Sequence, residues 1–183
     1  MRTLTQWSVS DYQNMRAAGL LDHHRCELIN GEIWDMSPEG ELHRFVNHRG
    51  VKYLRNLMRG QAEIFEAHLI TLASSEPQPD IAIVCLPDTR YLAHHPYPED
   101  IYWLVEVADT TLTYDLETKR QLYAQAGIRE YWVIDVTGRK LMVFKDLKQG
   151  DFATCQTLQT DTIKPIAFPD VEVPVRQLLE LPE

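Results

Sequence analysis

Two apolar segments, each carrying one acidic residue, constrain the fold of this chain more than any other feature. Residues 80–85 read DIAIVC, and residues 101–107 read IYWLVEV. Such runs are typical of strands that are buried on both faces of a mixed sheet. Asp80 begins the first run and Glu106 lies near the end of the second. Because an unpaired carboxylate is costly to bury, we expect both acids to have a partner or a role.

The remaining patterns predict helices around these strands. Asn30-Gly31, inside CELINGEIWDM, is a strong signal for a tight hairpin. Segments with helical periodicity, caps or glycine stops are residues 8–19, 41–59, 115–126 and 175–181. Phe45 belongs to the apolar stripe of the second segment, and we expect Thr113 or Asp115 to cap the third. Further strand patterns are residues 62–66, 69–72, 130–135, 140–144 and 152–158. The order predicts an α/β fold, a mixed β-sheet flanked by α-helices, with a loop over residues 86–100.

Length and composition favour one soluble domain spanning residues 1–183. A chain of 183 residues can bury a sizeable core. The first residues lack the apolar stretch of a signal peptide, and no apolar run approaches the roughly 20 residues of a membrane span. The three cysteines are far apart. We therefore expect a cytoplasmic protein without a membrane partner.

The formal net charge of −9 argues against a surface that is basic throughout. Proteins that bind nucleic acid usually present a basic surface to it. A local basic face remains possible on the predicted helix at residues 41–59, and the alternative is a solvated helix face without a partner. The basic residues concerned are Arg44, Arg49, Lys52, Arg55 and Arg59.

Lys119 falls on the inward face of the predicted helix at residues 115–126. At 100° per residue, it shares a stripe of about 80° with Leu116, Tyr123 and Ala126. A lysine facing a sheet needs a partner, and the carboxylates of Asp80 and Glu106 would provide one. The alternative is a lysine whose stem covers apolar surface while its ammonium group reaches solvent.

Two carboxylates and a lysine suit metal-assisted cleavage of a phosphodiester. Mg²⁺ usually binds one or two protein carboxylates and fills its other positions with water and phosphate. The metal lowers the pKa of its bound water and neutralises charge. A nearby lysine can orient that water or stabilise the developing negative charge. The set Asp80, Glu106 and Lys119 therefore predicts a nuclease site.

Four segments of the chain resemble a known family. They are CELINGEIWDMSPEGELH, QPDIAIV, LVEVADTTLTYDLETKRQLYAQAGIREYWVID and VEVPVRQLLE. Together they are similar to the restriction-endonuclease-like PD-(D/E)XK superfamily and, more closely, to the Uma-two endonuclease family, formerly a domain of unknown function. The resemblance covers nearly the whole chain, and the third segment is its most specific part.

The resemblance implies a restriction-endonuclease-like fold, a Mg²⁺-dependent centre that could also use Mn²⁺, DNA as the nucleic-acid partner, and a homodimer. Asp80 and Glu106 would be metal ligands, and Lys119 would be the catalytic lysine. In the wider superfamily the lysine lies two residues after the second acid, where this chain has Ala108. The family has Ser-Pro where this chain has Asp109-Thr110, so Asp109 either adds a carboxylate or caps a loop.

Two more positions match the family. Glu27 could bind metal directly or through water, or it could be an ordinary residue at a strand end. His43 could contact phosphate or transfer a proton, or it could make one local hydrogen bond at the start of a helix. Because a fold does not fix a function, the alternative to an enzyme is a catalytically silent binding or assembly module on the same fold.

Overall fold

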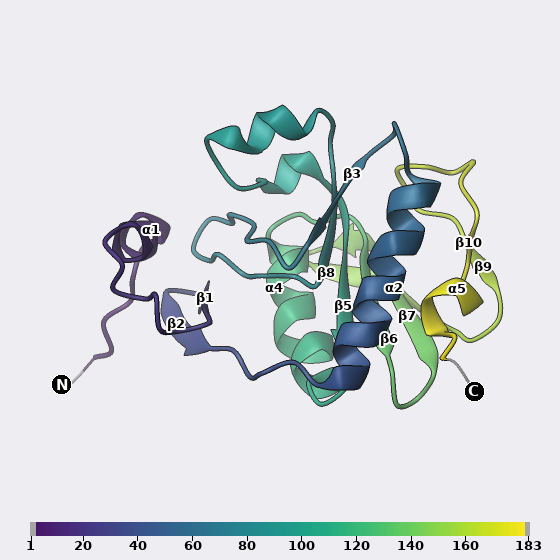
Figure 1. Cartoon of the computed structure of the whole chain (residues 1–183), viewed down its shortest axis with the longest axis horizontal. Coiled ribbons are helices and arrows are strands. Elements are labelled where there is room, and N and C mark those ends of the chain that lie inside the picture. The colour runs from purple at the N-terminus through teal and green to yellow at the C-terminus, as the bar shows by residue number, and fades with distance from the viewer. Residues whose placement is uncertain (1–2, 182–183) are drawn as a thin grey trace.

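The computed structural model describes residues 3–181 of the chain, and a mixed sheet of six strands forms its centre (Figure 1). All neighbouring strands run antiparallel except β5 and β6, which run parallel. In spatial order the strands are β3 (Glu63–Glu66), β4 (Ile81–Val84), β5 (Ile101–Ala108), β6 (Tyr131–Asp135), β7 (Lys140–Lys148) and β8 (Asp151–Leu158). The predicted α/β class is confirmed.

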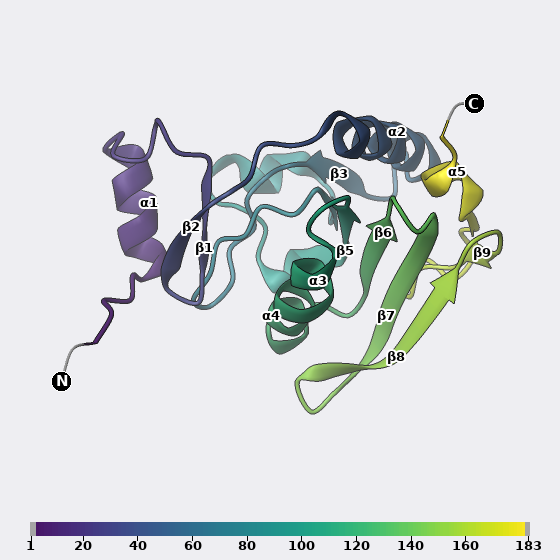
Figure 2. The same cartoon turned by 90° about the horizontal axis from the view of Figure 1, so that it is seen from below.

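Helices cover both faces of this sheet, as Figure 2 shows in a view along its edge. One face carries α2 (Glu41–Leu57), which packs against the short helix α5 (Arg176–Leu179). The other face carries the crossover between the parallel strands β5 and β6. The crossover consists of α3 (Leu112–Tyr114), the π-helical turn η3 (Asp115–Lys119) and α4 (Arg120–Gln125).

Alternation along β5 separates two hydrophobic cores. Trp103, Val105 and Val107 pack in the core beneath α2, and Leu104 and Ala108 pack in the core beneath α4. Successive side chains of a strand point to opposite faces. Glu106 therefore shares the α4 face with Leu104 and Ala108. This parity explains how an acid within an apolar strand reaches the crossover helix.

The N-terminal part forms a small layer of its own beside the sheet. Helix α1 (Val9–Ala17) packs through Tyr12 on a hairpin of β1 (Cys26–Ile29) and β2 (Glu32–Asp35). The turn residues Asn30 and Gly31 have φ of 49° and 81°, as a two-residue type I′ turn requires. In Figures 1 and 2 the hairpin lies between α1 and the rest of the molecule.

Most predicted elements are confirmed, but one strand was wrong and one helix begins earlier than predicted. Residues 69–72 form no strand, because their N–H groups bond to scattered loop carbonyls of Ser75, Pro77 and Pro96. The helix predicted from residue 115 begins at Leu112 and contains the π-helical turn, so neither Thr113 nor Asp115 caps it.

The rest of the chain adds short elements. The loop at residues 86–100 contains two 3₁₀ turns, η1 (Asp88–Leu92) and η2 (Pro98–Asp100), and β9 (Thr162–Ile163) pairs with β10 (Val173–Pro174). Within residues 3–181, no helix has the length and apolar character to cross a membrane.

Candidate active site

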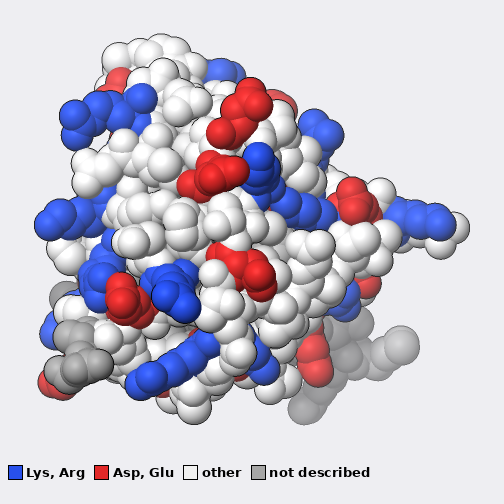
Figure 3. All heavy atoms as spheres, turned by 90° about the vertical axis from the view of Figure 1, so that its right-hand side faces the viewer, with Lys and Arg blue, Asp and Glu red and all other residues white. Residues whose placement is uncertain are grey.

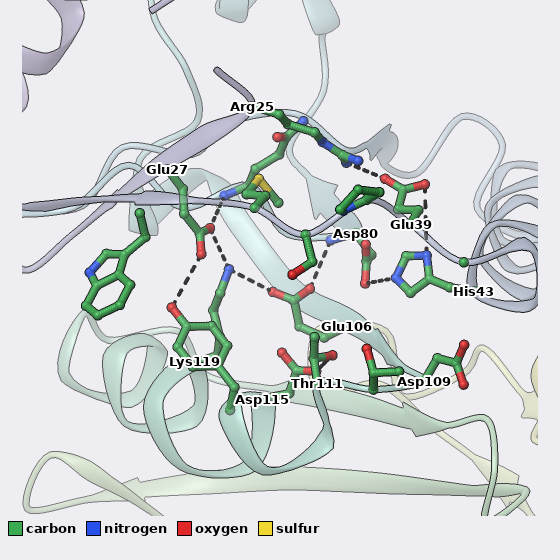
Figure 4. A pocket seen from close by; sticks show the side chains of 18 of the residues that line it. Arg25, Glu27, Glu39, His43, Asp80, Glu106, Asp109, Thr111, Asp115 and Lys119 are labelled. Atoms are coloured by element: carbon green, nitrogen blue, oxygen red, sulfur yellow. Dashed lines mark hydrogen bonds and ion pairs between the residues drawn. The ribbon is translucent and has the colours of Figure 1, made fainter. Parts of the chain in front are cut away.

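The predicted site residues come together in one pocket with a volume of about 460 Å³ (Figure 4). The pocket lies where four parts of the fold meet. They are β1, the N-terminal end of α2, the turn η3, and the ends of β4 and β5 that carry Asp80 and Glu106. All five residues singled out from the sequence line it: Glu27, His43, Asp80, Glu106 and Lys119.

The two strand acids are neighbours across the β4–β5 ladder. Ile81 pairs with Val105, so Asp80 lies beside Glu106 on the adjacent strand. The backbone N–H of Asp80 donates to Glu106 Oε2 at 3.2 Å, and the N–H of Val107 donates to Asp80 Oδ2 at 2.7 Å. Backbone donors thus fix both carboxylates in the same small volume.

Lys119 points into this pocket, and its side chain is only 4% exposed. Its Nζ atom donates to Glu27 Oε2 at 2.7 Å and lies 3.6 Å from Glu106 Oε1. The burial excludes the alternative of a lysine that reaches solvent. Glu27 is equally buried and also accepts the backbone N–H of Gln78 at 3.1 Å. It is therefore more than an ordinary residue at a strand end.

The π-helical turn η3 presents Lys119 to the pocket. The N–H of Arg120 donates to the carbonyl of Asp115, five residues earlier, which widens the helix locally. Both Asp115 and Lys119 are buried, whereas the intervening Glu117 is exposed. Turns of this kind are rare and are frequent at functional sites.

His43, in the first turn of α2, contacts Asp80 from the opposite side. Its Nε2 atom lies 3.1 Å from Asp80 Oδ2, and its Nδ1 atom lies 3.9 Å from Glu39 Oε2. Burial lowers the pKa of His43, but the hydrogen bond and charge of Asp80, with the charges of Glu39 and Asp115, outweigh it and raise the pKa. The histidine is therefore biased towards its charged form next to Asp80.

The carboxylates in the pocket perturb one another. Burial, together with the charges of Asp80 and Asp115, raises the pKa of Glu106 well above its usual value despite the opposing effect of Lys119. Burial would lower the pKa of Lys119, but the carboxylates of Glu106 and Glu27 raise it instead. Lys119 therefore stays charged, and Glu106 is ionised only at an energetic cost.

Three further residues contact the site that were not predicted to do so from the sequence. Asp115 was taken for a helix cap, but it is buried, accepts the Thr111 hydroxyl at 2.6 Å, and has its pKa raised to about 6, mainly by burial. Tyr123 donates to Glu106 Oε1 at 2.7 Å, and Tyr114 lies within 3.4 Å of Glu27 Oε1. Tyr123 could have been found, because it lies on the same predicted stripe as Lys119.

The donor set suits a divalent cation. The carboxylates that line the pocket outnumber its cationic groups, Arg25, His43 and Lys119. Within residues 3–181, no three His, Cys, Asp or Glu side chains form a preassembled metal cluster. Mg²⁺ needs only one or two protein carboxylates, and the adjacent pair Asp80 and Glu106 meets that requirement. The full set of carboxylates that line the pocket is Glu27, Asp35, Glu39, Asp80, Glu106, Asp109 and Asp115.

Basic residues elsewhere on the surface are mixed with acidic ones. Figure 3, the side at the right of Figure 1, shows Lys and Arg interspersed with Asp and Glu. On α2, Arg44 and Lys52 are exposed, whereas Arg49 donates to the Glu180 carbonyl and the exposed Arg55 donates to the Ile64 carbonyl. Arg59, just beyond the end of α2, donates to Asn56 Oδ1. Part of the basic helix is therefore engaged within the protein.

The chain was compared with curated proteins, with solved structures and with models of protein families. No curated protein matches the chain. A solved structure described as "a putative nuclease belonging to DUF820 from Anabaena variabilis ATCC 29413" superposes with a TM-score of 0.63. It covers 84% of this chain and 88% of its own, at 15% sequence identity, so the likeness shows a shared fold. The sequence model of the Uma2 family, described as "Putative restriction endonuclease", matches residues 9–176, and the chain therefore belongs to this family.

Proposed function

We propose that this protein is a metal-dependent endonuclease that hydrolyses phosphodiester bonds, with DNA as its substrate. The observation that supports it most is the convergence of Asp80, Glu106 and Lys119 in one pocket from three separate elements. The family description and the nuclease-like fold agree with this reading.

In this proposal Asp80 and Glu106 hold Mg²⁺, for which Mn²⁺ could substitute. When bound, such an ion supplies charge neutralisation at the phosphate and a water of lowered pKa. The adjacent carboxylates of the two residues provide hard oxygen ligands, and the remaining positions would be left to water and to the substrate.

Lys119 would act on the phosphate or on the attacking water. Its ammonium group is charged, buried and close to Glu106, so it can donate a hydrogen bond at the position where negative charge develops. Glu27 holds that ammonium group in place. We assign His43 to the positioning of Asp80, because its Nε2 atom contacts the carboxylate directly.

Nicking of a supercoiled plasmid in Mg²⁺ or Mn²⁺ tests this function. We expect Asp80→Asn and Lys119→Met to reduce the rate by about 100- to 1,000-fold, as loss of one preorganised charge-stabilising group does elsewhere. Lys140→Met is the matched control, because Lys140 lies outside the pocket and pairs with Asp135 at 3.5 Å. Cleavage that persists in both site variants would exclude this assignment.

The second candidate is a binding or assembly module without catalysis. The net charge of −9 and the alanine at position 108 favour it. It predicts that Mg²⁺ raises the melting temperature of the wild type but not of Asp80→Asn, while no plasmid is nicked. The homodimer that the family resemblance implies is a separate proposal, and light scattering over a range of concentrations tests it.

A further inference from the structure

The two faces of the β1–β2 hairpin have different surroundings. One face carries Cys26, Leu28 and Ile33, which pack against α1. Because side chains alternate along a strand, Glu27 lies on the other face, and Trp34 is its direct partner across the hairpin. Side chains of directly opposed residues in an antiparallel pair are neighbours on one face. The hairpin therefore presents Trp34 beside the carboxylate that binds Lys119.

Trp34 lines the candidate active-site pocket, yet 53% of its surface is exposed. By contrast, Trp103 and Trp132 of the central sheet are fully buried in the core. An indole ring at the open side of a pocket offers a flat apolar face to a ligand. The pocket volume of about 460 Å³ is in the range of sites that accept a small molecule or a single nucleotide.

We propose that Trp34 is a stacking platform for an unpaired nucleobase, so that this site takes single-stranded DNA or a nucleotide displaced from the duplex. The inference rests on the proposed nuclease function and specifies its substrate. Aromatic side chains bind single strands by stacking on bases, because every base has a π-face. The Glu27–Trp34 pairing places such a base next to Lys119, where the adjoining phosphate would lie.

A second copy of this chain is the competing occupant, since exposed tryptophans are also common at protein interfaces. The position of Trp34 favours the nucleotide. Its ring belongs to the wall of the same pocket that holds Asp80, Glu106 and Lys119, so a protein that covered it would close the site to any substrate.

Binding of a dye-labelled oligothymidine, followed by fluorescence anisotropy, tests this proposal. The full-length protein is used with Ca²⁺, after a gel has shown that the oligonucleotide stays intact, and a duplex of equal length is measured in parallel. We expect Trp34→Ala to weaken single-strand binding by about 10- to 100-fold and duplex binding much less. Trp34→Phe should retain most of the affinity. Trp7→Ala is the matched control, because Trp7 is 40% exposed but lies outside the pocket.

An oligothymidine that lacks one central base separates stacking from a structural effect. The missing base should weaken binding to the wild type and have no further effect on Trp34→Ala. Equal losses for single strand and duplex, no loss at all, or conversion of a dimer to a monomer by Trp34→Ala would overturn the proposal. A protein that nicks plasmid but shows no Trp34 dependence refutes this inference alone, whereas stacking without cleavage refutes only the nuclease.

Discussion

The Nζ atom of Lys119 lies 2.7 Å from the Oε2 atom of Glu27, a residue 92 positions earlier in the chain. Glu27 belongs to the β1–β2 hairpin. An isolated β-bridge between Leu28 and Glu76 joins this hairpin to the loop that precedes β4. The buried ion pair therefore ties the hairpin to the crossover helix as well as holding the lysine at the site. We expect loss of this ion pair to lower the free energy of unfolding and the rate of cleavage, each for a different reason.

Removal of Lys119 should destabilise the protein through the carboxylates that it leaves behind. Lys119→Met leaves Glu27 and Glu106 buried without their cation, and breaking such a pair costs about 3–5 kcal/mol. Glu27→Gln in the same background should restore part of that loss, because one uncompensated charge disappears. Urea unfolding in EDTA of the wild type, both single variants and the double variant measures the coupling energy.

The control for this cycle is Lys164→Met. Lys164 pairs with Glu172 at 3.3 Å, and both side chains are more than half exposed, so its loss should change the free energy of unfolding by less than about 1 kcal/mol. Strictly additive effects of Lys119→Met and Glu27→Gln would show that the contact contributes no coupling. Cleavage should stay low in the double variant even where stability recovers.

Metal binding should release protons from Glu106. Burial and the charges of Asp80 and Asp115 raise the pKa of this carboxyl, so the metal-free protein holds a proton there to higher pH than an exposed glutamate would. A cation binds the ionised form, and its apparent affinity should therefore rise with pH until the folded-state pKa is passed. Calorimetric titration with Mg²⁺ in buffers of different ionisation enthalpy measures the protons released.

Two variants sharpen that measurement. Asp115→Asn removes one of the negative charges that raise the pKa of Glu106, so proton release should move to lower pH. Asp151→Asn, whose side chain pairs with Arg120 outside the pocket, should behave as the wild type. Binding of Mg²⁺ with no dependence on buffer or pH would contradict protonation of Glu106.

The strand acids and the lysine could be predicted because each conflicts with a strong local pattern. Asp80 and Glu106 interrupt apolar strands, and Lys119 interrupts an apolar helical stripe, so burial alone marks them. The hairpin followed from Asn30-Gly31, whose backbone conformation few other residue pairs adopt easily. The sheet order around these elements then brought the acids side by side.

Other features depend on contacts that are distant in the chain. Nothing near Glu27 indicates that its partner is Lys119, and nothing near Asp115 indicates that the helix already begins at Leu112. Phe45 was predicted on the apolar stripe of α2, yet it is 40% exposed and lies near Arg49. Periodicity predicts which residues share a face but cannot tell how far the covering layer extends.

The pairing of His43 with Asp80 should give stability a specific pH dependence. The folded-state pKa of His43 is raised above its unfolded value of about 6.5. Its stabilising contribution is therefore fully present below pH of about 6.5 and is lost as pH rises through the folded-state value. His43→Gln should be less stable than wild type by about 1–2 kcal/mol at the acidic end, with a difference that shrinks as pH rises.

Unfolding in EDTA across this pH range measures the effect. His48→Gln, an exposed change on the same helix, is the matched control and should follow the wild-type curve. A wild-type and a His43→Gln curve that stay parallel at all pH values would show that His43 makes no charge-dependent contact with Asp80.

The turn of the β1–β2 hairpin, which contains Gly31, should be destabilised by a single added methyl group. Gly31 has φ of +81°, and a Cβ atom there would lie 2.9 Å from Gln6 Cβ and 3.3 Å from the Trp7 carbonyl oxygen. Gly127 has a similar φ of +86° but nothing within 4 Å of a Cβ. Gly127→Ala should thus cost only the left-handed backbone, about 1–2 kcal/mol. Gly31→Ala should cost at least about 1 kcal/mol more, because the methyl group also displaces neighbouring backbone.

Since this displacement moves the hairpin, plasmid nicking should fall in Gly31→Ala and stay unchanged in Gly127→Ala. Equal losses of stability, or undiminished nicking by Gly31→Ala, would show that the hairpin does not set the position of Glu27 at the site.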